Sequence, residues 1–188
     1  PTEYARMSVH GKARCEGIGI SGFYLPHRTS IELVGVSTVE QPFAFGEISQ
    51  NNQPLSFQGG FLYRVADAGK VFERYNFTIN PQTKQHLSED AHHLPEHILQ
   101  LVRKNTRRVV QANKLENILT MSEGLATEIF NELGNSKIIK DVGVTIESLY
   151  FLAPQPTPEI AKALGAEYRE TLLQRADTAV YARRALAV

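Results

Sequence analysis

The chain has 188 residues, which is enough for one domain with a substantial hydrophobic core. Its twenty basic residues balance its twenty acidic residues, and this argues against nucleic acid as a partner, because such a partner requires clustered positive charge. No apolar run approaches the roughly 18 residues that span a bilayer, so the sequence predicts no membrane-spanning helix.

Residues 1–82 are predicted to form antiparallel β structure. A β-branched run covers Ile31 to Val36, and phenylalanines alternate with polar residues between Gln41 and Ile48. From Leu55 to Val65 every second residue is apolar or glycine, which is typical of a strand with one buried face. Asp67 then has a side chain suited to capping a short helix.

Residues 83–157 change to a helical period. An amphipathic stripe runs from Leu94 to Val109, and Pro95 suits the first turn of that helix. The same helix carries a basic cluster, which we interpret as a solvated face, with contact to acidic lipid head groups or to a partner's carboxylates as the alternative. The cluster consists of Arg103, Lys104, Arg107 and Arg108.

A second helical stripe, Ile118 to Leu133, has its own start and stop signals. Thr120 and Glu123 fit a capping box, which predicts a break near Thr120, and Gly134 is expected to end the helix. A strand from Val142 to Leu152 follows. The predicted fold class is therefore α+β, with a β-rich antiparallel first half and a helix-rich second half that holds a further strand.

The end of the chain differs from everything before it. After the prolines Pro154, Pro156 and Pro158, a helix is predicted from Pro158 to Val188, with Thr157 as its N-cap. No stop signal follows, so this helix is expected to begin a coiled-coil stalk. A helix folded back onto its own domain is the alternative.

One stripe of the terminal helix contains small or apolar residues at spacings of three and four. Arginines on this helix lack acidic partners three or four residues away, so partners on another subunit are expected to supply the opposite charge. The predicted oligomer interface is Tyr168, Leu172, Arg175, Ala176, Ala179 and Arg183.

Gly17-Ile-Gly19-Ile-Ser-Gly22 matches the glycine pattern of dinucleotide-binding proteins. That pattern requires a strand before it and a helix opening at its last glycine. Here Pro26 occupies the position of the required helix. We therefore interpret the segment as a glycine-rich turn and predict no cofactor.

His93-Leu-Pro-Glu96-His97 matches the inverted zinc motif H-x-x-E-H. The motif requires both histidines on one continuous helix, one turn apart. Pro95 is expected to keep His93 outside the helix, and no third ligand is evident. A metal-dependent hydrolase using His93, Glu96 and His97 is kept as an alternative hypothesis, and no metal site is predicted.

Four segments, taken in order, carry a family resemblance: Phe61-Leu-Tyr63-Arg64-Val65-Ala-Asp67, Leu115-Glu116-Asn-Ile118-Leu119, Gly143-Val144-Thr-Ile146, and Ala176-Asp177-x-Ala179 with Arg183-Arg184. Together they resemble the stomatin–prohibitin–flotillin (SPFH) domain family. The resemblance implies an SPFH-like domain over residues 1–157, divided into 1–82 and 83–157. Residues 158–188 would then be the start of an oligomerisation helix.

The resemblance also implies a function. Proteins of this family are non-enzymatic, membrane-associated scaffolds that form homo- or hetero-oligomeric rings or cages, organise membrane microdomains, and regulate membrane proteases or channels. We expect the chain to begin inside a longer protein, with a hydrophobic segment upstream of Pro1 that contacts membrane lipids, and a place on the cytoplasmic face. A soluble adaptor that binds a partner protein through the β-rich half is the remaining hypothesis.

The single cysteine, Cys15, cannot form an internal disulfide, which favours a reducing compartment. We expect it to be buried and free, since free cysteines pack as small hydrophobic side chains. A lipidated or redox-active cysteine is the alternative.

Overall fold

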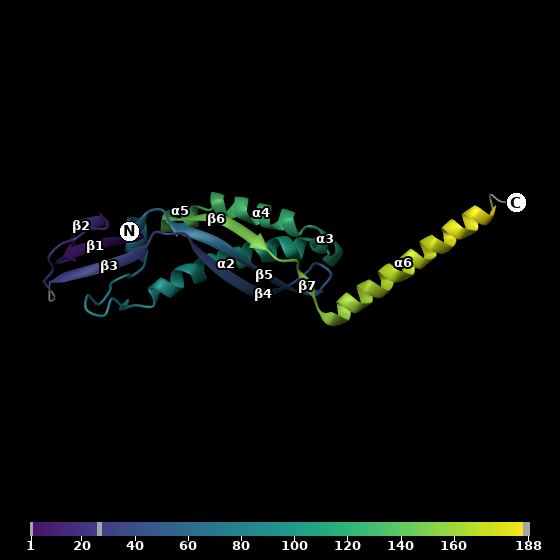
Figure 1. Cartoon of the computed structure of the whole chain (residues 1–188), viewed down its shortest axis with the longest axis horizontal. Coiled ribbons are helices and arrows are strands. Elements are labelled where there is room, and N and C mark those ends of the chain that lie inside the picture. Colours follow the sequence, from purple (N-terminus) through teal and green to yellow (C-terminus); the bar gives the residue numbers. More distant parts are fainter. Residues whose placement is uncertain (1, 26–27, 186–188) are drawn as a thin grey trace.

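The computed structural model describes residues 2–25 and 28–185. Two antiparallel sheets follow each other along an elongated body, helices cover one side of the second sheet, and the last helix projects from the far end (Figure 1). The predicted α+β fold class is confirmed. The coiled-coil character of the last helix stays a prediction.

The first sheet is formed by β1 (Glu3–Val9), β2 (Lys12–Ile18) and β3 (Thr29–Gly35), in the order β2-β1-β3. It buries little, and Val34 is its one core residue among those described. Cys15 is exposed, so the expectation that it is buried was wrong. The reason is that β2 is an edge strand and almost all of its residues face solvent.

The second sheet contains β4 (Val39–Ile48), β5 (Pro54–Val65) and β6 (Val144–Phe151), with the short β7 (Gln155–Pro156) pairing with β5. Apolar residues at every second position of β5 form its buried face, as the period-two pattern predicted. They are Leu55, Phe57, Phe61, Tyr63 and Val65.

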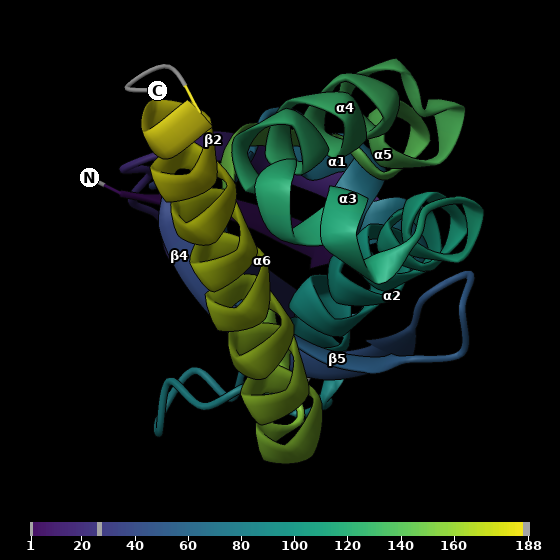
Figure 2. The same ribbon diagram turned by 90° about the vertical axis from the view of Figure 1, so that its right-hand side faces the viewer.

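Five helices precede the terminal one: α1 (Ala68–Arg74), α2 (Asp90–Ala112), α3 (Leu115–Thr120), α4 (Ser122–Asn135) and α5 (Lys137–Val142). Seen along the molecule, α2 and α4 lie together on one side of the second sheet (Figure 2). They pack against β4 and β6 and close the core with their apolar stripes. Asp67 caps α1 as predicted, because its carboxylate accepts a hydrogen bond from the backbone N–H of Lys70.

Helix α2 begins earlier than the sequence indicated. Pro95 was expected in the first turn, but the helix starts at Asp90 and Pro95 lies inside it. The Asp90 carboxylate accepts a hydrogen bond from the backbone N–H of Asn76, at 2.7 Å. Ala91 packs against the core. This tertiary contact and the packing compensate for the proline, and His93 therefore lies inside the helix.

Three other boundaries differ from the prediction. The break after Thr120 is present, but Met121 and not Thr120 is the N-cap of α4, so the predicted capping role of Thr120 is wrong, while the side chain of Glu123 lies outside the described part of the chain. Helix α4 continues through Gly134 to Asn135. The strand predicted from Val142 begins instead at Val144, because α5 extends to Val142 and ends at Gly143.

Candidate functional site

The terminal helix α6 (Pro158–Ala185) has 28 residues and extends about 42 Å at 1.5 Å per residue. Pro158 is its first residue, and the carbonyl of Thr157 accepts a hydrogen bond from Ala161. Only Ile160 and Leu164 of its described side chains pack against the core. The helix is therefore not folded back on its own domain, and the alternative raised from the sequence was wrong (Figure 1).

The structure leaves the predicted interface residues open to solvent. Tyr168 is 65% exposed and Leu172 is 45% exposed, and Arg175, Ala176 and Ala179 are also exposed. The side chain of Arg183 lies outside the part of the chain whose side chains the structure describes. The five described residues thus share one exposed helix. Whether they form an interface is a proposal.

Two more apolar side chains belong to this surface and were missed in the sequence analysis. Leu173 and Val180 are exposed, and they lie seven residues apart on α6. Because successive helical residues are about 100° apart, both lie beside Leu172 and Ala176 rather than opposite them. The seven-residue spacing was the available signal. The exposed apolar surface is therefore wider than a single stripe.

The charged side chains of α6 that the structure describes lack acidic partners on the helix, as the sequence predicted. No ion pair forms between the described side chains of this helix, and Arg169 bonds only the backbone oxygen of Gly165, at 2.9 Å. Arg175 makes no ion pair with any described residue. These guanidinium groups are free to bind carboxylates of another chain.

The root of α6 is fastened to the second sheet. The backbone N–H of Leu152 donates to Gln58 at 2.8 Å, and Gln155 and Pro156 then pair with Ser56 and Leu55 of β5. Pro154 between these contacts is buried. The proline elbow therefore fixes where α6 leaves the body, which gives the helix a defined direction.

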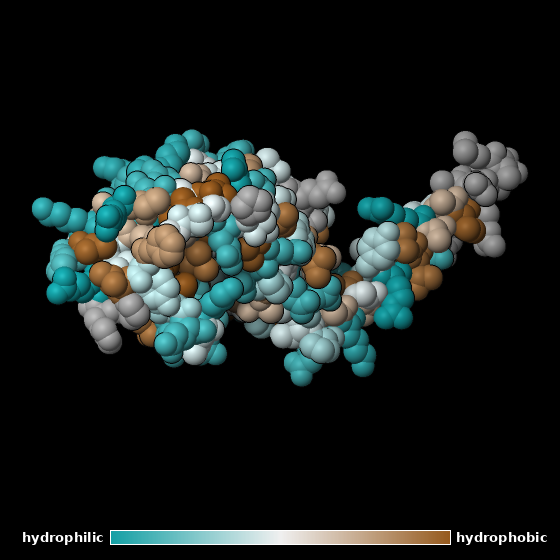
Figure 3. Space-filling view, turned by 60° about the vertical axis from the view of Figure 1, so that its left-hand side comes forward, coloured by the Kyte–Doolittle hydropathy of each residue, from teal (hydrophilic) through white to brown (hydrophobic). Residues whose placement is uncertain are grey.

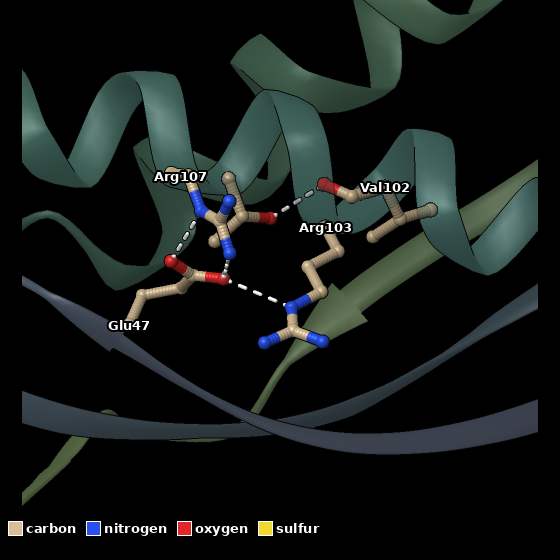
Figure 4. A network of polar contacts seen from close by, with 5 residues as sticks. Glu47, Val102, Arg103 and Arg107 are labelled. Atoms are coloured by element: carbon tan, nitrogen blue, oxygen red, sulfur yellow. Dashed lines mark hydrogen bonds and ion pairs between the residues drawn. The ribbon is translucent and has the colours of Figure 1, made fainter.

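A buried carboxylate stabilises the sheet at this root (Figure 4). The Glu47 side chain, 4% exposed on β4, accepts hydrogen bonds from Arg103 Nε at 3.0 Å, and from Arg107 Nε at 2.8 Å and Nη2 at 3.2 Å. Thr106, between the two arginines on α2, is fully buried and donates to the carbonyl of Val102 at 2.8 Å. This cluster joins β4 to α2.

Burial alone would raise the pKa of Glu47. The hydrogen bonds from Arg107 and Arg103 outweigh burial and hold that pKa below its usual value. The hydrogen bonds with Glu47 also raise the pKa of Arg107. The carboxylate is therefore ionised at neutral pH and paired with two cations whose side chains still reach solvent.

The basic cluster of α2 is thus mostly used within the chain. Arg103 and Arg107 bind Glu47, and Arg108 forms ion pairs with Glu132 and Glu128 of α4. Their side chains are 41%, 51% and 59% exposed, so they do lie on a solvated face as predicted, but their ion pairs within the chain were missed. A carboxylate distant in sequence decides their role, so no local pattern could have shown it.

The two enzyme-like motifs have other surroundings. His93 and His97 share α2, but His93 contacts Glu96 at 3.2 Å and His97 Nδ1 lies 2.7 Å from the Tyr75 hydroxyl. No group of three or more metal-ligating side chains forms among the described residues. The glycine motif begins at the end of β2, which includes Gly17 and Ile18, and residues 19–25 form no helix that could bind a pyrophosphate.

The sequence matches the SPFH domain / Band 7 family over residues 5–187. The match covers nearly the whole chain, so the chain belongs to this family, and the resemblance read from the four segments is confirmed. Members of the family are in general membrane-associated and non-enzymatic. No curated protein matches the chain. None of the described helices is long and apolar enough to cross a membrane.

Proposed function

We propose that this chain is a non-enzymatic, membrane-associated scaffold that assembles with further copies of itself, or of a paralogue, along α6. The assembly is a ring or cage on the cytoplasmic face that organises membrane microdomains or regulates membrane proteins such as proteases or channels. The observation that carries the proposal is α6, an exposed helix with an apolar surface and a fixed root. Its family supports the membrane association.

The hydrogen bonds within an isolated helix contribute too little free energy to explain why the chain has a long exposed helix such as α6. Packing against another helix supplies the further stabilisation. Burying one leucine side chain contributes about 2 kcal/mol. The described surface of α6 offers Leu172, Leu173, Tyr168 and Val180, which together can support association between neighbouring helices. The small residues Ala176 and Ala179 allow close approach.

The test is a pair of substitutions on opposite faces of α6. Leu172→Asp puts a charge into the proposed contact and removes about 2 kcal/mol of apolar burial per helix, which corresponds to roughly a thirtyfold weaker association. Ala163→Asp adds the same charge on the other side of the helix, where the side chain is exposed. Mass should be measured by light scattering over a wide range of concentration.

We expect concentration-dependent assembly of the native chain, loss of assembly for Leu172→Asp, and no loss for Ala163→Asp. Circular dichroism should show that both variants keep the folded domain. A native chain that stays monomeric at every concentration contradicts the proposal. Equal assembly of all three proteins places the contact elsewhere on the molecule.

A further inference from the structure

Apolar surface on this protein is not confined to α6. In the space-filling view, hydrophobic groups also reach the surface of the body between hydrophilic ones (Figure 3). The body contains a cavity of about 540 Å³, which is formed by the end of α1, by α2 and α5, and by the start of β6. Small-molecule sites have volumes of about 300–1,000 Å³, so the cavity has the size of such a site.

The floor of this cavity belongs to the hydrophobic core. It is formed by Leu94 and Ile98 of α2, Ile139 of α5 and Val144 of β6, all of which are buried. Ile138 of α5 also lines the cavity and is 54% exposed, so the apolar wall continues outward to solvent. A ligand in this cavity would cover apolar surface that water now contacts, and this favours binding.

Hydrogen bonds between the walls hold the cavity in a fixed shape. The backbone N–H groups of Ala66 and Asp67, just before α1, donate to the carbonyl of Gly143 at the end of α5, both at 2.9 Å. The Tyr75 hydroxyl, just after α1, lies 2.7 Å from His97 Nδ1 of α2. Helices α1 and α5 lie side by side (Figure 2). Because the cavity is already formed, a ligand would have to order little of the protein.

The charges of the walls favour an anion. Arg74, in the last turn of α1, lines the cavity, and no aspartate or glutamate is among the described residues that line it. Arg74 forms no ion pair with a described residue. A planar guanidinium binds a carboxylate through two parallel hydrogen bonds. One guanidinium therefore matches the single charge of a carboxylate.

Tyr75 and His97 add a neutral donor to these walls. Burial raises the pKa of Tyr75, so its hydroxyl is protonated at neutral pH and can donate to His97 Nδ1. A neutral His97 that accepts this hydrogen bond carries its own hydrogen at Nε2. Both residues line the cavity. This tautomer gives the walls a second hydrogen-bond donor for an anion.

We propose that this cavity binds a small monocarboxylate with a compact apolar body, whose carboxylate pairs with Arg74 while its apolar part covers Ile98 and Ile138. The apolar floor argues against a strongly polar ligand, and the absence of acidic side chains from the described walls argues against a cation. The cavity lies at the start of β6, whereas α6 is fastened near the other end of that strand. The proposal is therefore independent of assembly along α6.

The first experiment compares carboxylates with their neutral amides. The probes are 2-naphthoate and 4-phenylbutanoate, each beside its own amide, and calorimetry gives their affinities for the native chain. Methyl signals of isoleucine in NMR spectra give the position of the bound probe. Ile98, Ile138 and Ile139 line the cavity, and Ile160, at the start of α6, is the control position.

We expect saturable binding of at least one carboxylate, with methyl shifts at the three cavity isoleucines and none at Ile160. Its amide should bind about tenfold more weakly, because the amide has no charge to pair with the guanidinium. The proposal is overturned if neither carboxylate binds, if the amides bind as tightly as the acids, or if only isoleucines outside the cavity shift.

The second experiment uses matched substitutions. Arg74→Gln removes the proposed partner of the carboxylate, and Lys137→Gln removes an exposed charge of α5 that does not line the cavity. Ile138→Ser removes apolar wall, and Leu87→Ser is its control at an exposed position outside the cavity. All four side chains are exposed, so the variants should keep the native circular dichroism.

We expect Arg74→Gln to weaken carboxylate binding about tenfold and to leave amide binding unchanged. Ile138→Ser should weaken the binding of acid and amide alike, and both controls should keep the native affinity. Equal carboxylate binding by the native chain and Arg74→Gln overturns the proposal. A cavity variant that loses self-association but keeps carboxylate binding identifies this surface as a contact between copies and also overturns it.

Discussion

At the scale of single residues, Glu47 is the most constrained charge in the described structure. Its carboxylate is buried while Arg103 and Arg107 remain half-exposed. The three residues are therefore not equivalent. Without Glu47 the arginines can turn to water, but without the arginines the carboxylate stays buried and unpaired.

This asymmetry predicts which substitutions are costly. Arg103→Met with Arg107→Met should destabilise the protein more than Glu47→Met, because an uncompensated buried carboxylate at Glu47 costs about 3 kcal/mol. Arg108→Met is the control, since Arg108 pairs with exposed glutamates and surface pairs contribute little. Urea unfolding gives the three midpoints. A Glu47→Met protein less stable than the double variant would contradict this ranking.

The pH dependence of stability should separate the same proteins. In the native chain the lowered pKa of Glu47 contributes stability above the unfolded pKa, and this contribution is lost as pH falls through the folded value. In the double arginine variant only burial remains, which raises the pKa, so that variant should gain stability on acidification. The difference in unfolding free energy between the native protein and the double variant should therefore begin to narrow above the ordinary glutamate pKa of 4.5, where the variant protonates Glu47, and should narrow further below it, where the native protein does so. If the difference between the two unfolding free energies did not change with pH, Glu47 would not be the group that separates the two proteins.

At the scale of elements, two glycines show how helix ends are determined. Gly143 ends α5 with a φ of 82°, and a Cβ at this position would overlap the carbonyl oxygen of Asp67. Gly134 lies inside α4, where a Cβ would meet nothing within 4 Å. The sequence pattern assigned the end of α4 to Gly134, but α4 continues to Asn135, and it is the next helix, α5, that ends at a glycine.

Alanine substitutions at these two positions should have opposite effects. Gly143→Ala should cost about 3 kcal/mol, because it combines left-handed strain with a steric overlap. Gly134→Ala should stabilise the protein by up to about 1 kcal/mol, because alanine is the better helix former. Thermal unfolding followed by circular dichroism measures both. A destabilised Gly134→Ala protein would mean that α4 does not continue through this position.

At the scale of the whole molecule, stability is unevenly distributed. The core lies between the second sheet and α2 and α4, whereas among the described residues the first sheet contributes Val34 as its one fully buried member, with Tyr4 partly buried against the core. The first sheet is joined to the rest mainly through β3, where Leu33 and Ile31 bond the segment at Phe77 and Ile79. Helix α6 thus leaves the molecule from its more stable end.

Hydrogen exchange should follow this distribution. Amides of β5 should exchange slowest, because this strand pairs on both sides and its buried face is covered. Amides of β2 should exchange fastest among the main strands, because it is an exposed edge strand. Mass spectrometry of peptides from both segments gives the comparison. Equal protection of β2 and β5 would contradict the view that the first sheet is held weakly.

Local pattern determined much of this protein. The alternation in β5 sets its buried face, since period two admits one register against the core. The stripes of α2 and α4 mark the sides that cover the sheet, and the proline elbow marks the start of α6. For α6, the sequence alone also predicted an exposed surface with unpaired arginines, because nearby residues on a helix lie close in space.

Only the tertiary structure decided the remaining features, since each depends on residues that are distant in the chain. Arg107 meets Glu47 across 60 positions, and Asn76 fixes the start of α2 through Asp90. Likewise, burial cannot be read from composition at a loop, so Phe23 is revealed as exposed only once β2 and β3 are in place. Periodicity reports local geometry, whereas contacts between elements are set by how the chain folds back on itself.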